Sequence, residues 1–316
     1  MSTATLPERE LAATLPTATW RDWSCQVRLV VTDPAVLVAA SADLSALMAR
    51  IERAASRFRP DSELSRANRQ AGRPVAVSRL LVELVDTALA EAARSGGALD
   101  PVLGHDLVRL GYDRDISELA GRAIAAPAGP GRRPNWRQLR LDRTAGLLTV
   151  PAGAALDLGA SAKSQAADWA AAELADRYGG SVLVEIGGDL AVAGPKADWQ
   201  IAVAERAGGR QRQQVSLHSG GLATSTTTIR AWQAGEQVLH HIIDPATGQP
   251  ADGPWRTVTV AAASAVHANT CSTSAIVLGA RAPAWLAGQG VAARLIGLTG
   301  ELVVLGGWPE PAVSTC

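Results

Sequence analysis

Gly-rich turns divide the second half of the chain into short apolar stretches. Four of these stretches have the length and composition of β-strands: residues 182–186, 199–204, 215–217 and 256–262. Several connections between them are short enough for hairpins, which join antiparallel neighbours. We therefore expect an α+β (mixed α/β) fold with a mixed, largely antiparallel sheet, and not a doubly wound parallel sheet.

Helical spacing of apolar residues appears in three places: over residues 44–55, over 81–89 and between 163 and 178. Ser78 stands where it can cap the second of these helices. The polar segment between the first two contains Pro60-Asp61-Ser62, which is typical of a turn leading into a short helix. These helices are expected to flank the sheet.

The start of the chain is rich in Ala, Thr and Pro. We expect residues 1–19 to be a flexible leader to a single domain over residues 20–316. Apolar and polar residues then alternate from Trp23 to Val31, which predicts a half-buried strand. Residues 121–134, rich in Gly, Pro, Ala and Arg, are expected to form a surface loop within that domain.

Acidic and basic side chains are equal in number, 30 of each, so the chain has no net charge. This balance provides no long-range field for a polyanion, and we expect no nucleic-acid partner. Among the basic residues Lys163 and Lys196 are the only lysines, and all others are arginine. A lysine next to a motif is therefore informative.

The three cysteines, Cys25, Cys271 and Cys316, fit neither a disulfide framework nor a zinc-ligand spacing. The first residues lack a basic segment followed by an apolar run, so we expect neither a signal peptide nor a lipobox and infer a cytoplasmic location. Residues 257–280 lack charged side chains, but their second half is polar. We interpret them as a buried site and expect no membrane span.

Two motifs combine small residues with an ionisable one. Residues 156–164, LDLGASAKS, run from an apolar stretch into a helix, where backbone amides and Lys163 could meet a phosphate. The spacing is not that of a Walker loop, and an ordinary strand-to-helix turn would explain the same residues. Gly187-Gly188-Asp189 by itself favours a tight turn.

Two further motifs could carry the chemistry. His240 and His241 precede the turn sequence Asp244-Pro245-x-Thr247-Gly248, and a histidine there could accept a proton near neutral pH or simply be packed. If a helix begins near Asn269, this residue and Thr273 share a face and could ligate Mg²⁺ through oxygen. Helix capping by the same residues is the alternative.

In this order, the motifs resemble those of the ApbE-type FAD:protein FMN transferases over about residues 20–305. They are SRFRPDSELS at 56–65, ALDP at 98–101, LDLG with AK at 156–163, GGD at 187–189, GLATS at 221–225, HIIDPxTG at 241–248, and Ser272-Thr273. The resemblance implies a domain related to the T-fold. It also implies an enzyme that binds FAD and Mg²⁺, releases AMP and joins FMN by a phosphoester to a Thr or Ser of a partner protein.

The resemblance also assigns roles to individual residues. It implies that His241 is the base that takes the proton of the acceptor hydroxyl. The metal would be held by the Ala160 carbonyl and by the side chains of Asn269 and Thr273. The positions that would contact or enclose FAD are Trp23, Phe58, Leu99, Asp100, Pro101, Asp157, Lys163 and Ile243.

Two departures from the family pattern bear on activity. Asn269 stands where the family usually has Asp, which removes a negative charge from the metal site, and His267 lies nearby. Trp23-Ser24-Cys25 replaces the usual Met-Gly-Thr, so Trp23 could stack on the flavin ring or fill part of its space. Two alternatives therefore remain open: an FAD pyrophosphatase that releases FMN and AMP, and a flavin-binding protein without catalysis.

Overall fold

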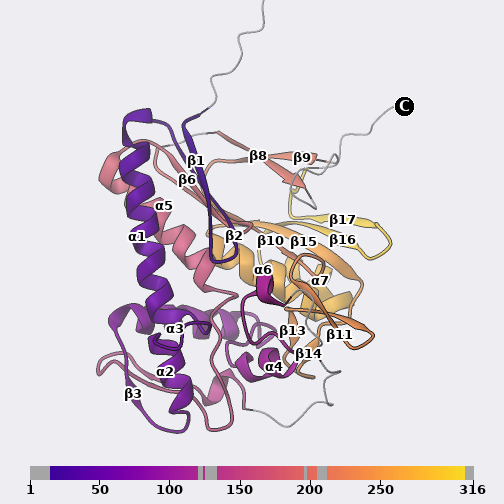
Figure 1. Cartoon of the computed structure of the whole chain (residues 1–316). Helices are drawn as coiled ribbons and strands as arrows, with labels where there is room; N and C mark the ends of the chain where they lie inside the picture. Colours follow the sequence, from indigo (N-terminus) through magenta and orange to yellow (C-terminus); the bar gives the residue numbers. More distant parts are fainter. Residues whose placement is uncertain (1–14, 120–123, 125–133, 196–197, 205–211, 310–316) are drawn as a thin grey trace, which may run out of the picture.

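A computed structural model describes residues 15–119, 124, 134–195, 198–204 and 212–309. Its central element is an eight-stranded sheet, in the order β1-β2-β6-β7-β10-β15-β16-β17, with every neighbouring pair antiparallel (Figure 1). The strands are β1 (Thr17–Asp22), β2 (Cys25–Val31), β6 (Val182–Ile186), β7 (Asp189–Ala193), β10 (Gly220–Thr226), β15 (Trp255–Ala262), β16 (Ala292–Gly297) and β17 (Leu302–Leu305). The expected α+β class is confirmed.

Smaller sheets surround the central one. They are formed by β3 (Val75–Ala76), β5 (Leu147–Thr149) and β4 (Arg140–Asp142), by β8 (Trp199–Ala204) and β9 (Arg212–Leu217), by β11 (Ala231–Ala234) and β12 (Gln237–His240), and by β13 (Ile243–Asp244) and β14 (Gln249–Pro250). The four strands expected in the second half of the chain are all present.

The central sheet is buried on both faces because alternate residues of its middle strands point to opposite sides. In β2, Val27, Leu29 and Val31 enter the core beneath the helices, whereas Val30 faces the other way. On that second face the β8–β9 hairpin covers the sheet, with Trp199 in the same apolar cluster as Val30. The sheet therefore lies between a helical layer and a hairpin.

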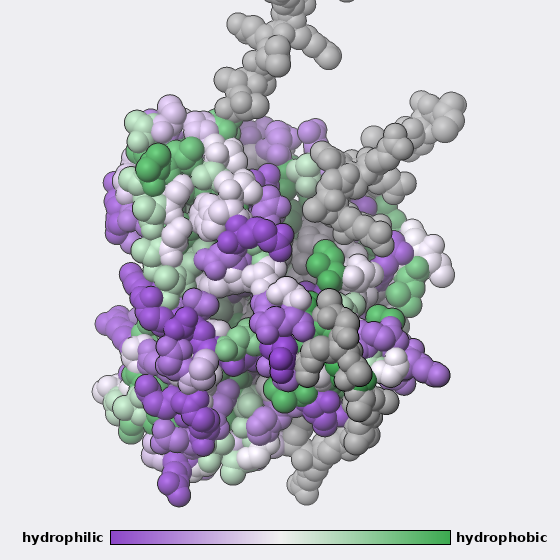
Figure 2. Space-filling view, in the orientation of Figure 1, coloured by the Kyte–Doolittle hydropathy of each residue, from purple (hydrophilic) through white to green (hydrophobic). Residues whose placement is uncertain are grey.

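The helical layer contains α1 (Leu37–Ala55), α5 (Ala162–Tyr178) and α6 (Ala265–Leu278), and α5 and α6 pack on the middle strands. The other helices are α2 (Glu63–Arg69), α3 (Arg79–Arg94), α4 (Gly104–Arg109) and α7 (Ala282–Ala287). Ser62 and Ser78 cap α2 and α3, so the predicted caps are confirmed. Helices α2, α3 and α4 gather at the lower end of Figure 1, where hydrophilic side chains cover much of the surface in Figure 2.

The β1–β2 turn differs from the prediction. Strand β1 begins at Thr17, so the sheet includes residues expected in the leader, while residues 1–14 lie outside the described part. Strand β2 begins at Cys25 because Trp23 and Ser24 form a two-residue turn with φ of 46° and 55°. Positive φ at both positions suits a hairpin of this length, but it strains residues other than Gly. The observed strand therefore begins two residues later than predicted.

Residues 257–280 do not form one helix, because they are divided between β15 and α6. A different stretch, Pro34–Ala55, is long and apolar enough to span a membrane by length and composition alone. Its inner residues Leu44, Met48 and Ile51 are buried in the core, and a core helix passes the same test. The loop expected at 121–134 falls almost wholly outside the described residues.

Candidate active site

A cavity of about 480 Å³ opens between the sheet, helix α5 and the α4 region. Its lining includes the C-terminal end of α1, the loop into α5, the β6–β7 turn, and residues of β10, β13 and α6. All twelve residues singled out from the sequence line this one cavity: Trp23, Phe58, Leu99, Asp100, Pro101, Asp157, Ala160, Lys163, His241, Ile243, Asn269 and Thr273. Their separate roles stay predictions.

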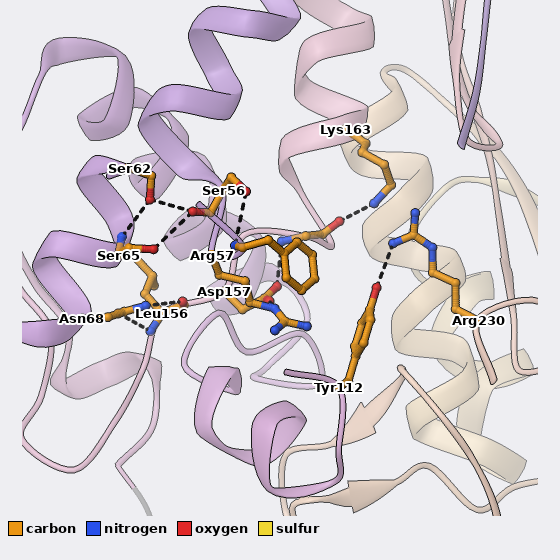
Figure 3. Close-up of polar contacts among 12 residues, drawn as sticks. Ser56, Arg57, Ser62, Ser65, Asn68, Tyr112, Leu156, Asp157, Lys163 and Arg230 are labelled. Carbon is orange, nitrogen blue, oxygen red and sulfur yellow. Dashed lines mark hydrogen bonds and ion pairs between the residues drawn. The ribbon is translucent and has the colours of Figure 1, made fainter. Parts of the chain in front are cut away.

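Serine and asparagine side chains fix the loop that follows α1 (Figure 3). The Ser62 hydroxyl donates to the Ser56 carbonyl at 2.6 Å, and the Ser65 hydroxyl donates to the same oxygen at 3.4 Å. Asn68 is bonded to both the N–H and the carbonyl of Leu156, at 2.7 and 2.9 Å. These bonds tie α2 to the segment before α5 and bring Arg57 next to Asp157.

Arg57, Phe58, Tyr112 and Asp157 form one side of the cavity, which we call the paired wall. Arg57 Nε lies 2.5 Å from Asp157 Oδ2, and both side chains are largely buried. The guanidinium also lies over the rings of Phe58 and Tyr112, with its central carbon 4.1 and 4.5 Å from their centroids. The charge of Arg57 is therefore already neutralised within the protein.

Lys163, Arg230 and His241 form the opposite side, which we call the open wall. Lys163 Nζ donates to the Gly159 carbonyl at 2.5 Å, and Arg230 Nη1 donates to the Tyr112 hydroxyl at 3.5 Å (Figure 3). Neither cation has an ion pair with a carboxylate among the described residues. Burial, and then the charge of Arg230, lowers the pKa of Lys163. Neither cation is therefore neutralised by an ion pair, although the charge of Asp189 acts on Lys163.

The adjacent histidines have different environments. His240 Nε2 lies 3.2 Å from the Ala251 carbonyl, and His240 does not line the cavity. His241 lines it, and burial together with the charges of Arg230 and Lys163 lowers its pKa to about 3. Its imidazole is therefore neutral at pH 7. Its Nδ1 is buried without a hydrogen-bond partner, so no contact among the described residues fixes which ring nitrogen carries the proton.

Oxygen atoms gather where β7 meets α6. Asn269 Nδ2 donates to Asp189 Oδ1 at 3.1 Å, and Asn269 Oδ1 and Asp189 Oδ2 are buried without hydrogen-bond partners. The Thr273 and Ser225 hydroxyls are 2.8 Å apart. Burial raises the pKa of Asp189 to about 6, with the charge of Lys163 acting in the opposite direction. Such an oxygen-rich set suits a hard cation such as Mg²⁺, which usually also binds substrate phosphate.

Two local expectations need correction, and the place of His267 becomes clear. Helix α6 begins at Ala265, capped by Ser264, so Asn269 lies in its second turn and is not a cap. His267, in the first turn, does not line the cavity. In the loop before α5 the N–H groups of Gly159, Ser161 and Ala162 donate within the protein, to the Asp157 carboxylate and the Leu158 carbonyl. These three amides are not free for a phosphate.

Several cavity residues were not selected from the sequence. Arg57 and Asp189 stood inside recognised motifs, but their side chains carried no separate signal. Asp189 reaches the cavity because Gly187 and Gly188 adopt φ of 64° and 99° in a two-residue turn, after which β7 begins. Arg230 had no local signal, since only the fold brings it to Lys163.

Comparison with known proteins places the chain among its relatives. Residues 22–295 match the model of the ApbE family. The FAD:protein FMN transferase of Treponema pallidum (strain Nichols) is 32% identical over 282 residues, which cover 81% of this chain and 76% of that protein. A FAD:protein FMN transferase of Klebsiella pneumoniae (strain 342) is 27% identical over 95% of this chain and 86% of its own length.

Solved structures support the same fold. The ApbE protein of Thermotoga maritima superposes with a TM-score of 0.79 at 24% identity, covering 92% of this chain and 97% of that one. The apo form of the flavinyl transferase ApbE of Pseudomonas stutzeri gives a TM-score of 0.74 at 24% identity, covering 92% and 94%. From the match over residues 22–295 and the 32% identity, we conclude that the chain belongs to the ApbE family.

Proposed function

We propose that this chain is an FAD:protein FMN transferase, as its curated relatives are named. The observation that carries the proposal is the open wall. A neutral imidazole and two cations without ion-pair partners face one cavity, and Asn269 and Asp189, which also line it, each have a buried oxygen without a hydrogen-bond partner. Phosphoryl transfer needs this combination of positioning, charge neutralisation and a proton acceptor.

In the proposed reaction, the hydroxyl oxygen of an acceptor Thr or Ser attacks the phosphorus on the flavin side of the FAD pyrophosphate. The new P–O bond links FMN to the protein, and the bond to the bridging oxygen breaks, so AMP leaves with that oxygen. The His241 imidazole takes the hydroxyl proton. Lys163 and Arg230 hold the negative charge of the pyrophosphate in place during transfer.

The same electrostatics explain when His241 becomes a useful base. Without ligand, burial together with the charges of Arg230 and Lys163 keeps the pKa of the imidazole low, which makes it neutral but weakly basic. A bound pyrophosphate adds negative charge next to these cations and therefore raises the pKa of His241. Proton acceptance is then strongest when FAD is in place.

We also propose a Mg²⁺ requirement. The Ala160 carbonyl, Asn269 Oδ1 and the Thr273 hydroxyl would hold the ion, and the buried Asn269 oxygen without a partner fits such a role. When bound, Mg²⁺ neutralises charge on the pyrophosphate. The paired wall and Trp23, Leu99 and Ile243 would enclose the rest of FAD.

Incubation with FAD, Mg²⁺ and the unflavinylated form of a protein that serves as acceptor for a related transferase tests the proposal. We expect an acid-stable fluorescent band at the acceptor on a denaturing gel, with AMP released in equal amount. Free FMN with AMP and no labelled band would show a pyrophosphatase instead. FAD binding with neither product would show a binding protein, and both results would reject transfer.

A further inference from the structure

The cation site has an unusual distribution of charge. Asn269 contributes a neutral oxygen where the resemblance leads one to expect a carboxylate. Asp189 lies against it at hydrogen-bond distance, and the two side chains are 7% and 2% exposed. Since Asp189 begins β7 and Asn269 belongs to α6, the pair joins the sheet to the helical layer.

The hydrogen bond between Asn269 and Asp189 determines which oxygen of each side chain is left without a partner. Asn269 uses its amide N–H to bind Asp189 Oδ1, so its own Oδ1 is directed elsewhere and is buried without a partner. Asp189 Oδ2 is likewise without a partner, and both residues line the cavity. Two buried acceptors without donors are costly in the protein alone, and a bound cation would satisfy both.

We propose that Asp189 supplies the negative charge of the cation site, and that Asn269 is matched to it as a neutral partner. This inference rests on the proposed function for the presence of a divalent cation. A carboxylate at position 269 would stand within hydrogen-bond distance of Asp189 and repel it, whereas the amide binds it. The pair therefore presents one charge and two free oxygens.

The direct test is Mn²⁺ binding to the full chain, followed by the electron paramagnetic resonance signal of the free ion. Titrations are run with Mn²⁺ alone and with ADP present, against ADP blanks. We expect Asp189→Asn to weaken Mn²⁺ binding at least about tenfold. The exchange variant Asp189→Asn/Asn269→Asp should recover to within about threefold of the unmodified chain, because it returns one charge to the pair.

Asp168→Asn is the matched control. Asp168 is another largely buried carboxylate on α5 that accepts from the N–H groups of Ala265 and Val266, at 2.8 and 3.0 Å, but it does not line the cavity. This variant should lose thermal stability and keep its Mn²⁺ affinity within about threefold, because the charge of Asp168 is only a minor influence on Asp189. If Asp189→Asn does not fold, the exchange variant is compared with the unmodified chain, and loss of Mn²⁺ binding in it overturns the inference.

Three results would overturn the inference: unchanged Mn²⁺ affinity in Asp189→Asn, an exchange variant as weak as Asp189→Asn, or no Mn²⁺ binding by the unmodified chain. If Asp189 were only a counter-ion for Lys163, Asp189→Asn would tighten FAD binding in EDTA and leave Mn²⁺ affinity unchanged. FMN transfer is measured separately. Its absence with the expected Mn²⁺ pattern would reject the proposed function but not the cation site.

Discussion

The two walls of the cavity differ in whether their cations are paired with a carboxylate. On the paired wall Arg57 is bonded to Asp157 and covered by two aromatic rings. On the open wall burial and then the charge of Arg230 lower the pKa of Lys163, and no carboxylate of the described chain forms an ion pair with either cation. The charges of the paired wall are balanced without a ligand. The open wall holds two cations that repel each other, which is unfavourable until a ligand binds.

This difference separates structural charges from those that serve a ligand. Removal of a group from the paired wall should leave a buried charge without a partner and lower stability. Removal of a cation from the open wall should relieve repulsion and affect binding instead. Variants of the paired wall should therefore lose stability, whereas variants of the open wall should lose FAD affinity.

The largest effect is expected at His241. His241→Ala should reduce the rate of FMN transfer by about 10²- to 10⁴-fold, because the proton acceptor is lost. FAD affinity, measured by flavin fluorescence, should change by less than about threefold. His240→Ala, which alters the neighbouring ring outside the cavity, is the control, and its transfer rate should stay near that of the unmodified chain. Equal losses of binding and rate in His241→Ala would make His241 a packing residue.

Next in size is the loss of a cation from the open wall. Lys163→Met or Arg230→Met should weaken FAD binding by about tenfold to a hundredfold, the usual worth of a charge-assisted hydrogen bond. The melting temperature should stay level or rise. Arg177→Met removes a half-exposed arginine that pairs with Asp43 and Glu173, and it should leave FAD affinity unchanged. A lower melting temperature with unchanged affinity in the cavity variants would contradict the distinction between the walls.

The paired wall should respond in the opposite way. Arg57→Met leaves the largely buried Asp157 carboxylate without its cation, and we expect a loss of about 1–3 kcal/mol in the free energy of unfolding. Urea denaturation measures this loss. The double variant Arg57→Met/Asp157→Asn should recover part of it, because no unpaired charge remains. Full stability in Arg57→Met would show that the ion pair is not structural.

A smaller effect is expected in acid. The folded-state pKa of His241, about 3, lies below the ordinary value of 6.5, so its contribution to stability is present above pH 6.5 and is lost as the pH falls toward 3. At pH 5 the loss amounts to about 2 kcal/mol. Asp189 acts in the opposite direction, because its raised pKa favours the folded state at low pH.

The comparison of the unmodified chain with His241→Gln isolates the histidine, since both contain Asp189. The difference in unfolding free energy between them should shift with pH between 6.5 and 5, with His241→Gln relatively more stable in acid. A difference that does not change over this range would show that the imidazole titrates normally in the folded protein.

The fold class could be predicted from the sequence, because alternation and helical spacing are local properties. The family resemblance selected twelve residues, and the structure places them all in one cavity. The sequence did not predict features that depend on distant contacts. Helix α6 begins four residues before Asn269 because Ser264 caps it and Asp168, on another helix, accepts from its first amides. The position of Arg230 depends likewise on how the chain folds back toward α5.

Strain and pairing were also outside the reach of sequence patterns. The alternation of apolar and polar residues includes Trp23 and therefore predicted a strand there. In the structure Trp23 and Ser24 form a turn in which both have positive φ. Asp157 was expected to contact FAD, but its ion pair with Arg57 depends on the serine network that shapes the loop after α1. A contact between Asp157 and FAD remains a prediction.

The most direct measurement is a crystal structure of His241→Ala soaked with FAD and Mg²⁺, a variant in which turnover should be slow. We predict that the pyrophosphate lies on the open wall within hydrogen-bond distance of Lys163 and Arg230, that Arg57 stays bonded to Asp157, and that the metal contacts Asn269 Oδ1. A pyrophosphate bound to Arg57, with Lys163 and Arg230 turned away from it, would contradict this account.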